Sequence, residues 1–107
     1  MSSKALIVNA VCAMFIVVPI AGAEQLTIIQ ESKAFSKKNV NISVGDTINF
    51  ANNDKKTHNV YSRSKGHKFD IGAQRPGTSA SHTFTAPGKV KVRCAIHPRM
   101  KLTVNVE

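Results

Sequence analysis

Apolar and polar residues alternate in several short runs along most of the chain. The pattern is clearest in residues 40–44, 47–50, 90–94 and 102–106. A period of two indicates half-buried β-strands, and beyond the first 23 residues no stretch keeps helical spacing for more than a turn. The sequence therefore predicts an all-β fold. In it, the first two runs form a hairpin-like pair around Gly45-Asp46.

Turn-forming residues separate the predicted strands. Arg75-Pro76-Gly77 suits a type II turn, with Pro at its second position and Gly at its third. About seven to eight short strands with turns between them fit a sandwich of two sheets. Residues 24–107 are too few for a second domain, so they are expected to form a single one.

The first 23 residues have a different pattern. Lys4 precedes the apolar stretch 5–20, and the small residues 21–23 follow it. This predicts a signal peptide, residues 1–23, that is removed from a mature chain of residues 24–107. An uncleaved anchor is the alternative, but the apolar run is shorter than the roughly 20 residues that span a bilayer. We expect a periplasmic protein with no stable membrane insertion after cleavage.

The mature chain is strongly cationic. Of 15 Lys and Arg residues only Lys4 lies in the leader, so the net charge of +9 falls to +8 with His neutral. Such a charge implies an acidic partner or an anionic surface, and export makes nucleic acid the least favoured partner.

Cys94 is the one cysteine left in the mature chain, because Cys12 lies in the leader. It therefore has no partner for an internal disulfide. In an exported protein this leaves three explanations: pairing with another molecule, burial as a small apolar side chain, or use as a metal thiolate.

Three soft or borderline metal ligands lie within seven residues: Cys94, His97 and Met100. Two imidazoles and a thiolate with a weak axial thioether suit copper, because this set accommodates both Cu(I) and Cu(II). His58, which begins a predicted strand after a polar turn, is the candidate for the second imidazole. Each residue alone would more often be structural, but together they predict a site for one copper ion.

The other two histidines are given structural roles. His67 lies in a polar loop and is expected to be solvated. His82 shares a strand face with Ala80 and Phe84, so we expect it near a sheet end with a hydrogen-bond partner.

Several segments resemble the plastocyanin, pseudoazurin and amicyanin group of cupredoxins, over roughly residues 42–106: Val44-Gly45-Asp46-Thr47-Ile48-Asn49-Phe50, Asn52, Asp54, His58-Asn59-Val60, and Phe84-Thr85-Ala86-Pro87-Gly88 before Cys94. The short Cys-x-x-His-x-x-Met loop, with Pro after His, is most similar to amicyanin. The resemblance implies a Greek-key β-sandwich and a soluble type 1 copper protein that carries single electrons and is not an enzyme.

The resemblance also implies a role for each site residue. His58 becomes the buried ligand, Cys94 the thiolate, His97 the ligand near the surface and Met100 the axial ligand. Asn59 is expected to join its strand to the ligand loop, with its backbone N–H directed at the sulfur of Cys94.

Two positions depart from the group's pattern. Ala95 stands where the group often has a hydroxyl residue that can bond to Asn59, and Ile96 stands where Pro is frequent. Neither departure removes a ligand, but both bear on the rigidity of the loop and on the reduction potential.

Two other functions remain open. A copper storage or delivery protein could use the same four ligands, and a cationic protein that binds anionic surfaces would need Cys94 only for structure. An electron carrier would be a monomer with redox proteins as donor and acceptor.

Clustered cations bear on the choice of partner. Arg93, Arg99 and Lys101 lie close to the ligands in sequence, so they are expected to surround His97 and favour a partner with an acidic docking face, whereas Lys33 lies outside this segment. The row Lys89, Lys91 and Arg93 is interpreted as a solvated strand face that also discourages edge aggregation.

Overall fold

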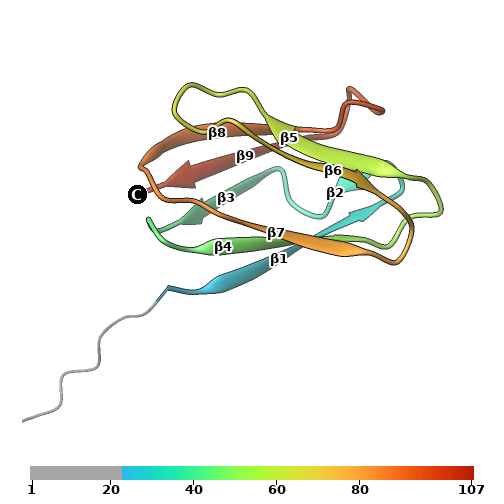
Figure 1. The fold of residues 1–107 in the computed structure, drawn as a ribbon, viewed down its shortest axis with the longest axis horizontal. Helices are drawn as coiled ribbons and strands as arrows, with labels where there is room; N and C mark the ends of the chain where they lie inside the picture. The colour runs from blue at the N-terminus through green and yellow to red at the C-terminus, as the bar shows by residue number, and fades with distance from the viewer. Residues whose placement is uncertain (1–22) are drawn as a thin grey trace, which may run out of the picture.

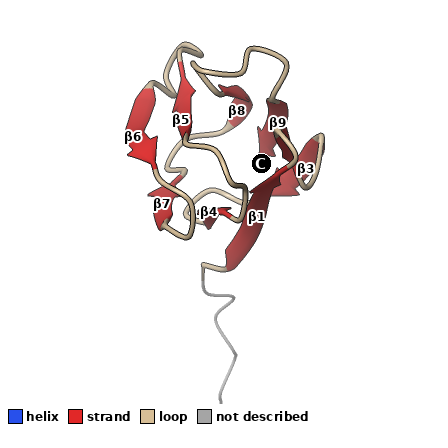
Figure 2. Ribbon diagram, turned by 90° about the vertical axis from the view of Figure 1, so that its right-hand side faces the viewer, coloured by secondary structure: helices blue, strands red, loops and turns tan. Residues whose placement is uncertain are grey.

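The computed structural model describes residues 23–107, which fold into two facing β-sheets (Figures 1 and 2). The strands are β1 Gln25–Glu31, β2 Ala34–Phe35, β3 Asn39–Ile42, β4 Thr47–Asn52, β5 His58–Ser62, β6 Phe69–Gln74, β7 Ser79–Thr83, β8 Gly88–Arg93 and β9 Lys101–Val106. One sheet has the order β2-β1-β4-β7 and the other β3-β9-β8-β5-β6. The predicted all-β sandwich is confirmed. The described residues form nine strands, against the predicted seven to eight, because the structure adds the two-residue strand β2.

Two sequence expectations concern the N-terminal region. The predicted signal peptide falls almost wholly on residues 1–22, outside the described part of the chain. Within residues 23–107, no helix is long and apolar enough to cross a membrane.

The core lies between the two sheets and follows the predicted alternation. In β8 and β9 every second side chain is buried, and their neighbours point outward. Seven core side chains are completely inaccessible to solvent: Ile28, Ile48, Phe50, Val60, Val90, Val92 and Val104. Burial of each such side chain contributes about 1.5–3 kcal/mol, so this layer is the main source of stability.

The predicted hairpin of residues 40–44 and 47–50 is wrong. The strand β3 pairs in parallel with β9, whereas β4 pairs in parallel with β1 in the other sheet. The connection between them turns where Asp46 N–H donates to Ser43 O at 3.0 Å, with Gly45 at a φ of 96°. Alternation identifies a strand and its buried face, but any partner strand satisfies it equally.

The predicted turn after β6 is confirmed. Thr78 N–H donates to Arg75 O at 3.1 Å, and Gly77 has the positive φ, 85°, that the third position of a type II turn requires. This turn carries the chain from β6 in one sheet to β7 in the other.

Aromatic stacking, and not the expected hydrogen bond, holds His82. Its ring stacks on Phe69 of β6, with centroids 3.9 Å apart, and meets Phe84 edge-on at 4.7 Å. Within residues 23–107 these ring contacts, and no hydrogen bond, hold the His82 side chain. Burial lowers the pKa of His82, and His67 adds to the effect. His67 was expected to be only solvated, but its Nε2 lies 3.1 Å from Pro87 O, within hydrogen-bonding distance.

The row of cations on β8 does not protect a sheet edge. β8 lies between β9 and β5, so it is an interior strand of its sheet. The interpretation that Lys89, Lys91 and Arg93 discourage edge aggregation is therefore wrong, although these residues do alternate with the buried positions as predicted.

Asp46 joins the start of β1 to the turn before β4. Its carboxylate accepts bonds from the backbone N–H groups of Glu24 and Ser43, both at 2.9 Å, and these bonds lower its pKa below 3.8. Because the folded-state pKa is lowered, the carboxylate stabilises the fold above about pH 3.8, and this contribution is lost as pH falls through the folded-state value.

Asp46→Asn should therefore reduce the free energy of unfolding more at neutral pH than at a pH well below 3.8. Urea unfolding of both proteins at the two pH values measures the difference, and effects from other carboxyl groups cancel in the comparison. Equal losses at the two pH values would contradict this role of the carboxylate.

Candidate metal centre

Two segments far apart in sequence bring three ligand atoms together. His58 is the first residue of β5, and Cys94 and His97 lie in the loop between β8 and β9, at the end of the sandwich opposite the C-terminus (Figure 1). His58 Nδ1 lies 3.0 Å from His97 Nδ1 and 3.8 Å from Cys94 Sγ, and Cys94 Sγ lies 3.9 Å from His97 Nδ1. These three atoms form a compact triangle.

The triangle has the dimensions of a metal site. Imidazole nitrogen and thiolate sulfur bind ions such as zinc at about 2.0–2.3 Å. All three separations, from 3.0 to 3.9 Å, are shorter than two such bonds end to end, so one ion can contact every ligand. Two imidazoles and one thiolate in a trigonal set are typical of copper sites that transfer electrons.

Asp54 sets the orientation of the His58 ring. His58 Nε2 lies 2.9 Å from Asp54 Oδ2. An ionised carboxylate only accepts hydrogen bonds, so Nε2 carries the hydrogen and Nδ1 keeps its lone pair, directed at the cluster. The same carboxylate accepts a bond from Lys33 N–H at 2.8 Å, which together with His58 lowers the pKa of Asp54 to about 2.

The sequence analysis missed this role of Asp54. A carboxylate four residues before a candidate histidine ligand was a usable signal, because ligating imidazoles usually donate their second N–H to such a group.

Asn59 joins β5 to the ligand loop, as the resemblance implied. Its backbone N–H donates to Cys94 Sγ at 3.4 Å, and its side-chain Oδ1 accepts a bond from Ala95 N–H at 3.3 Å. The missing hydroxyl at position 95 therefore does not break the link, because the backbone of Ala95 supplies the donor. Asn59 Nδ2 is in turn held by Asp70 Oδ1 at 2.9 Å.

The last two candidate ligands of the β8–β9 loop, His97 and Met100, differ in how deeply they are buried. His97 is half-buried, and burial lowers its pKa, with a further contribution from His58, so the neutral, metal-binding form is favoured. Met100 N–H donates to His97 O at 2.9 Å, and the Met100 side chain is buried with the core. This places Met100 directly after the turn at His97, and its part as axial ligand stays a prediction.

The cations around His97 differ from those expected. Arg99 lies there as predicted, in a hollow of about 440 Å³ that Ile96, His97 and Pro98 also line. Lys33, which was placed outside the site, lines the same hollow, because the β1–β2 turn brings it there with positive φ at Ser32 and Lys33.

Arg93 and Lys101 do not join this group. They pair across β8 and β9 and face outward from the sheet, where both line a different hollow. The expectation that they surround His97 is wrong.

The site's geometry agrees with a family assignment made on sequence. Residues 23–107 match the family model of copper binding proteins, plastocyanin/azurin family. The chain belongs to this family. As a plastocyanin/azurin family member it is a copper-binding electron-transfer protein, and the His58, Cys94 and His97 cluster supports one copper ion as its cofactor.

Solved structures place the chain among the cupredoxins. A purple cupredoxin from Nitrosopumilus maritimus is 26% identical, with 77% of this chain and 99% of that chain covered and a TM-score of 0.68. A reduced amicyanin mutant is 25% identical, with 83% and 86% covered and a TM-score of 0.71. A copper-containing nitrite reductase from Thermus scotoductus shares the fold at 24% identity and a TM-score of 0.72, with 89% of this chain but 24% of that chain covered. No curated protein matches the sequence.

Asp54→Ala should weaken copper binding by about 10- to 100-fold, because His58 loses the group that fixes its ring. Asp54→Asn is the matched control, since its side-chain oxygen still accepts the Nε2 hydrogen of His58. Competition with a chelator of known affinity measures both variants. Wild-type affinity in Asp54→Ala, with the fold intact by circular dichroism, would show that Asp54 does not position the ligand.

Proposed function

We propose that this family member is an exported type 1 copper protein that carries single electrons between redox partners and catalyses no reaction itself. Residues 1–23 are its signal peptide, and residues 24–107 are the mature, monomeric periplasmic domain. His58, Cys94, His97 and Met100 hold the copper ion. The observation that carries this proposal is the triangle of His58, Cys94 and His97, whose atoms lie within 4.8 Å of one another.

Bound copper supplies a one-electron Cu(I)/Cu(II) couple. The chain's own residues restrict how far the ligands move during such a change. Asp54 holds the ring of His58, and Asn59 holds both the sulfur of Cys94 and the backbone of Ala95. Because none of these bonds is made to the metal itself, they hold the ligands in the same positions in both oxidation states.

Electrons are expected to pass through the surface near His97. Ile96 is 51% exposed, and it lines the same hollow as Pro98 and His97. An apolar surface beside a half-buried ligand permits close, brief contact with another redox protein. With Met100 as the axial ligand, the proposed set leaves no open position for a substrate, which favours a carrier over an enzyme.

Cys94→Ser should fold but lose the intense blue absorption of the Cu(II) form, because that band requires the thiolate. Met100→Leu should keep the colour and raise the reduction potential, since the thioether is only a weak axial ligand. Absorption spectroscopy and voltammetry measure both effects. A blue band that survives in Cys94→Ser would refute the thiolate assignment.

A carrier and a storage protein differ in how they release copper. The buried Cys94 and the ties at Asp54 and Asn59 predict slow loss of copper to a chelator together with fast electron self-exchange. Chelator kinetics and NMR line broadening in mixtures of Cu(I) and Cu(II) protein test the two properties. Rapid copper loss with slow self-exchange would favour storage or delivery.

A further inference from the structure

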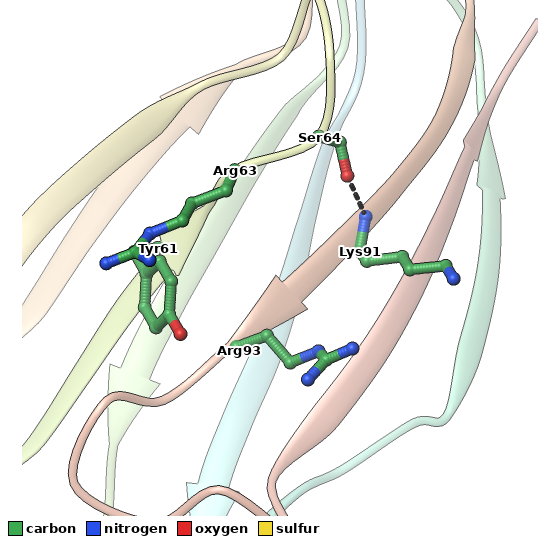
Figure 3. A pocket seen from close by; sticks show the side chains of 5 residues that line it. All are labelled: Tyr61, Arg63, Ser64, Lys91 and Arg93. Carbon is green, nitrogen blue, oxygen red and sulfur yellow. Dashed lines mark hydrogen bonds between the residues drawn. The ribbon is translucent and has the colours of Figure 1, made fainter.

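A cationic surface covers the outer face of the five-stranded sheet, away from the ligand cluster. We define the cationic sheet face as Tyr61, Arg63, Lys91, Arg93 and Lys101 (Figure 3 shows four of these). In the strand register Arg93 lies opposite both Tyr61 of β5 and Lys101 of β9. Three neighbouring strands therefore present one continuous row of these side chains.

Two shallow hollows lie along this face. One, of about 350 Å³, is lined by Tyr61, Arg63, Ser64, Lys91 and Arg93. The next, of about 260 Å³, shares Lys91 and Arg93 and adds Lys101. Each hollow thus has three cationic side chains at its border and no carboxylate among its lining residues, which suits an incoming acidic group.

Within residues 23–107, no Lys or Arg of the cationic sheet face forms an ion pair. The one salt bridge found in residues 23–107 joins His58 and Asp54, so no Lys or Arg there has a carboxylate partner. Asp70 lies opposite Tyr61 in the register of β5 and β6 and borders a neighbouring hollow with Arg63, so its carboxylate offsets part of the charge at the Tyr61 end of the row. The two hollows that contain Lys91 and Arg93 have no such carboxylate.

This arrangement has a cost in the isolated protein. Like charges directly opposite on neighbouring strands, as in Arg93 and Lys101, are destabilising. Protection of an edge does not explain them, because β8 is an interior strand. Negative charge supplied by another molecule would offset the repulsion.

We propose that the cationic sheet face docks the carboxylate-bearing surface of a redox partner protein. This rests on the proposed electron-carrier function. Tyr and Arg are the residue types enriched at the energetic centres of protein interfaces, and here Arg63 lies 5.5 Å from the centre of the Tyr61 ring. A row across three strands matches an extended protein surface better than it matches one small anion.

Partner recognition and electron exit then use different surfaces. The hollow beside His97 has two cations, Lys33 and Arg99, around apolar Ile96 and Pro98. The charged contact is made on the sheet, and the apolar contact at the ligand loop.

The test uses copper-loaded, reduced mature protein, which is diamagnetic, and a short polyglutamate peptide as the probe. In ¹⁵N NMR at low salt, shift changes should gather in residues 61–64, 91–93 and 101–103. Arg93→Glu and Lys91→Glu should each weaken peptide binding by about tenfold or more. Arg75→Glu, an equal charge change in the exposed β6–β7 turn outside both hollows, should have a much smaller effect.

Several outcomes would overturn the docking proposal: no peptide binding, shift changes centred on residues 32–33 and 96–99, or equal weakening by Arg75→Glu and Arg93→Glu. Phosphatidylglycerol vesicles that bind more tightly than the peptide, with the same dependence on Arg93, would assign the face to a membrane instead. The copper spectrum of each variant checks that its site is intact. A colourless wild-type protein would refute the carrier function and leave the peptide map readable, so the two failures are distinguishable.

Discussion

The hydrogen bond between His58 Nε2 and Asp54 is the constraint on which the metal centre depends. His58 is the one cluster ligand outside the β8–β9 loop, and its Nε2 is held by Asp54 from the segment just before β5. Asp54 determines which nitrogen carries the hydrogen and therefore which one faces Cys94 and His97. The carboxylate is itself held by Lys33 N–H, so the β1–β2 turn also contributes to the position of the ligand.

A second tie, at Asn59, joins the two ligand-bearing segments directly. Its backbone donates to the sulfur of Cys94, and its side chain accepts from Ala95. With β5 and β8 paired in the same sheet, β5 and the loop start from a shared framework. Function follows from this rigidity, because an electron carrier works fastest when its ligands hardly move between oxidation states. The two sheets fix the positions of β5 and the β8–β9 loop, and the hydrogen bonds of Asp54 and Asn59 hold the metal-binding side chains at that end of the sandwich.

Local patterns were sufficient to predict most of the strands, their buried faces and the members of the His58, Cys94 and His97 cluster. Val90, Val92 and Cys94 share the inward face because alternation determines which side chains point to the core, and the spacing from Cys94 to His97 is itself a local signal. Pairing could not be predicted in this way. The alternation of β3 and β4 is the same in a hairpin as in two separate sheets, so the sequence suggested the wrong neighbours.

Contacts between loops could not be predicted from the sequence either. Lys33 is 64 residues from His97 along the chain, yet the two residues line the same hollow. The β1–β2 turn brings Lys33 there, with positive φ at Ser32 and Lys33, neither of which is glycine. Arg93 is adjacent to Cys94 in sequence but points to the opposite face of the sheet. Distance along the chain was therefore a poor guide to which cations surround the site.

We expect the hydrogen bonds at Asp54 and Asn59 to hold the ligands in place before copper binds. A crystal structure of the metal-free mature protein tests this most directly. We expect His58 Nδ1, Cys94 Sγ and His97 Nδ1 to stay within 4.8 Å of one another there, with the His58–Asp54 bond intact. A metal-free structure in which His58 has turned away from Asp54, or in which the β8–β9 loop has moved His97 out of reach of Cys94, would contradict it.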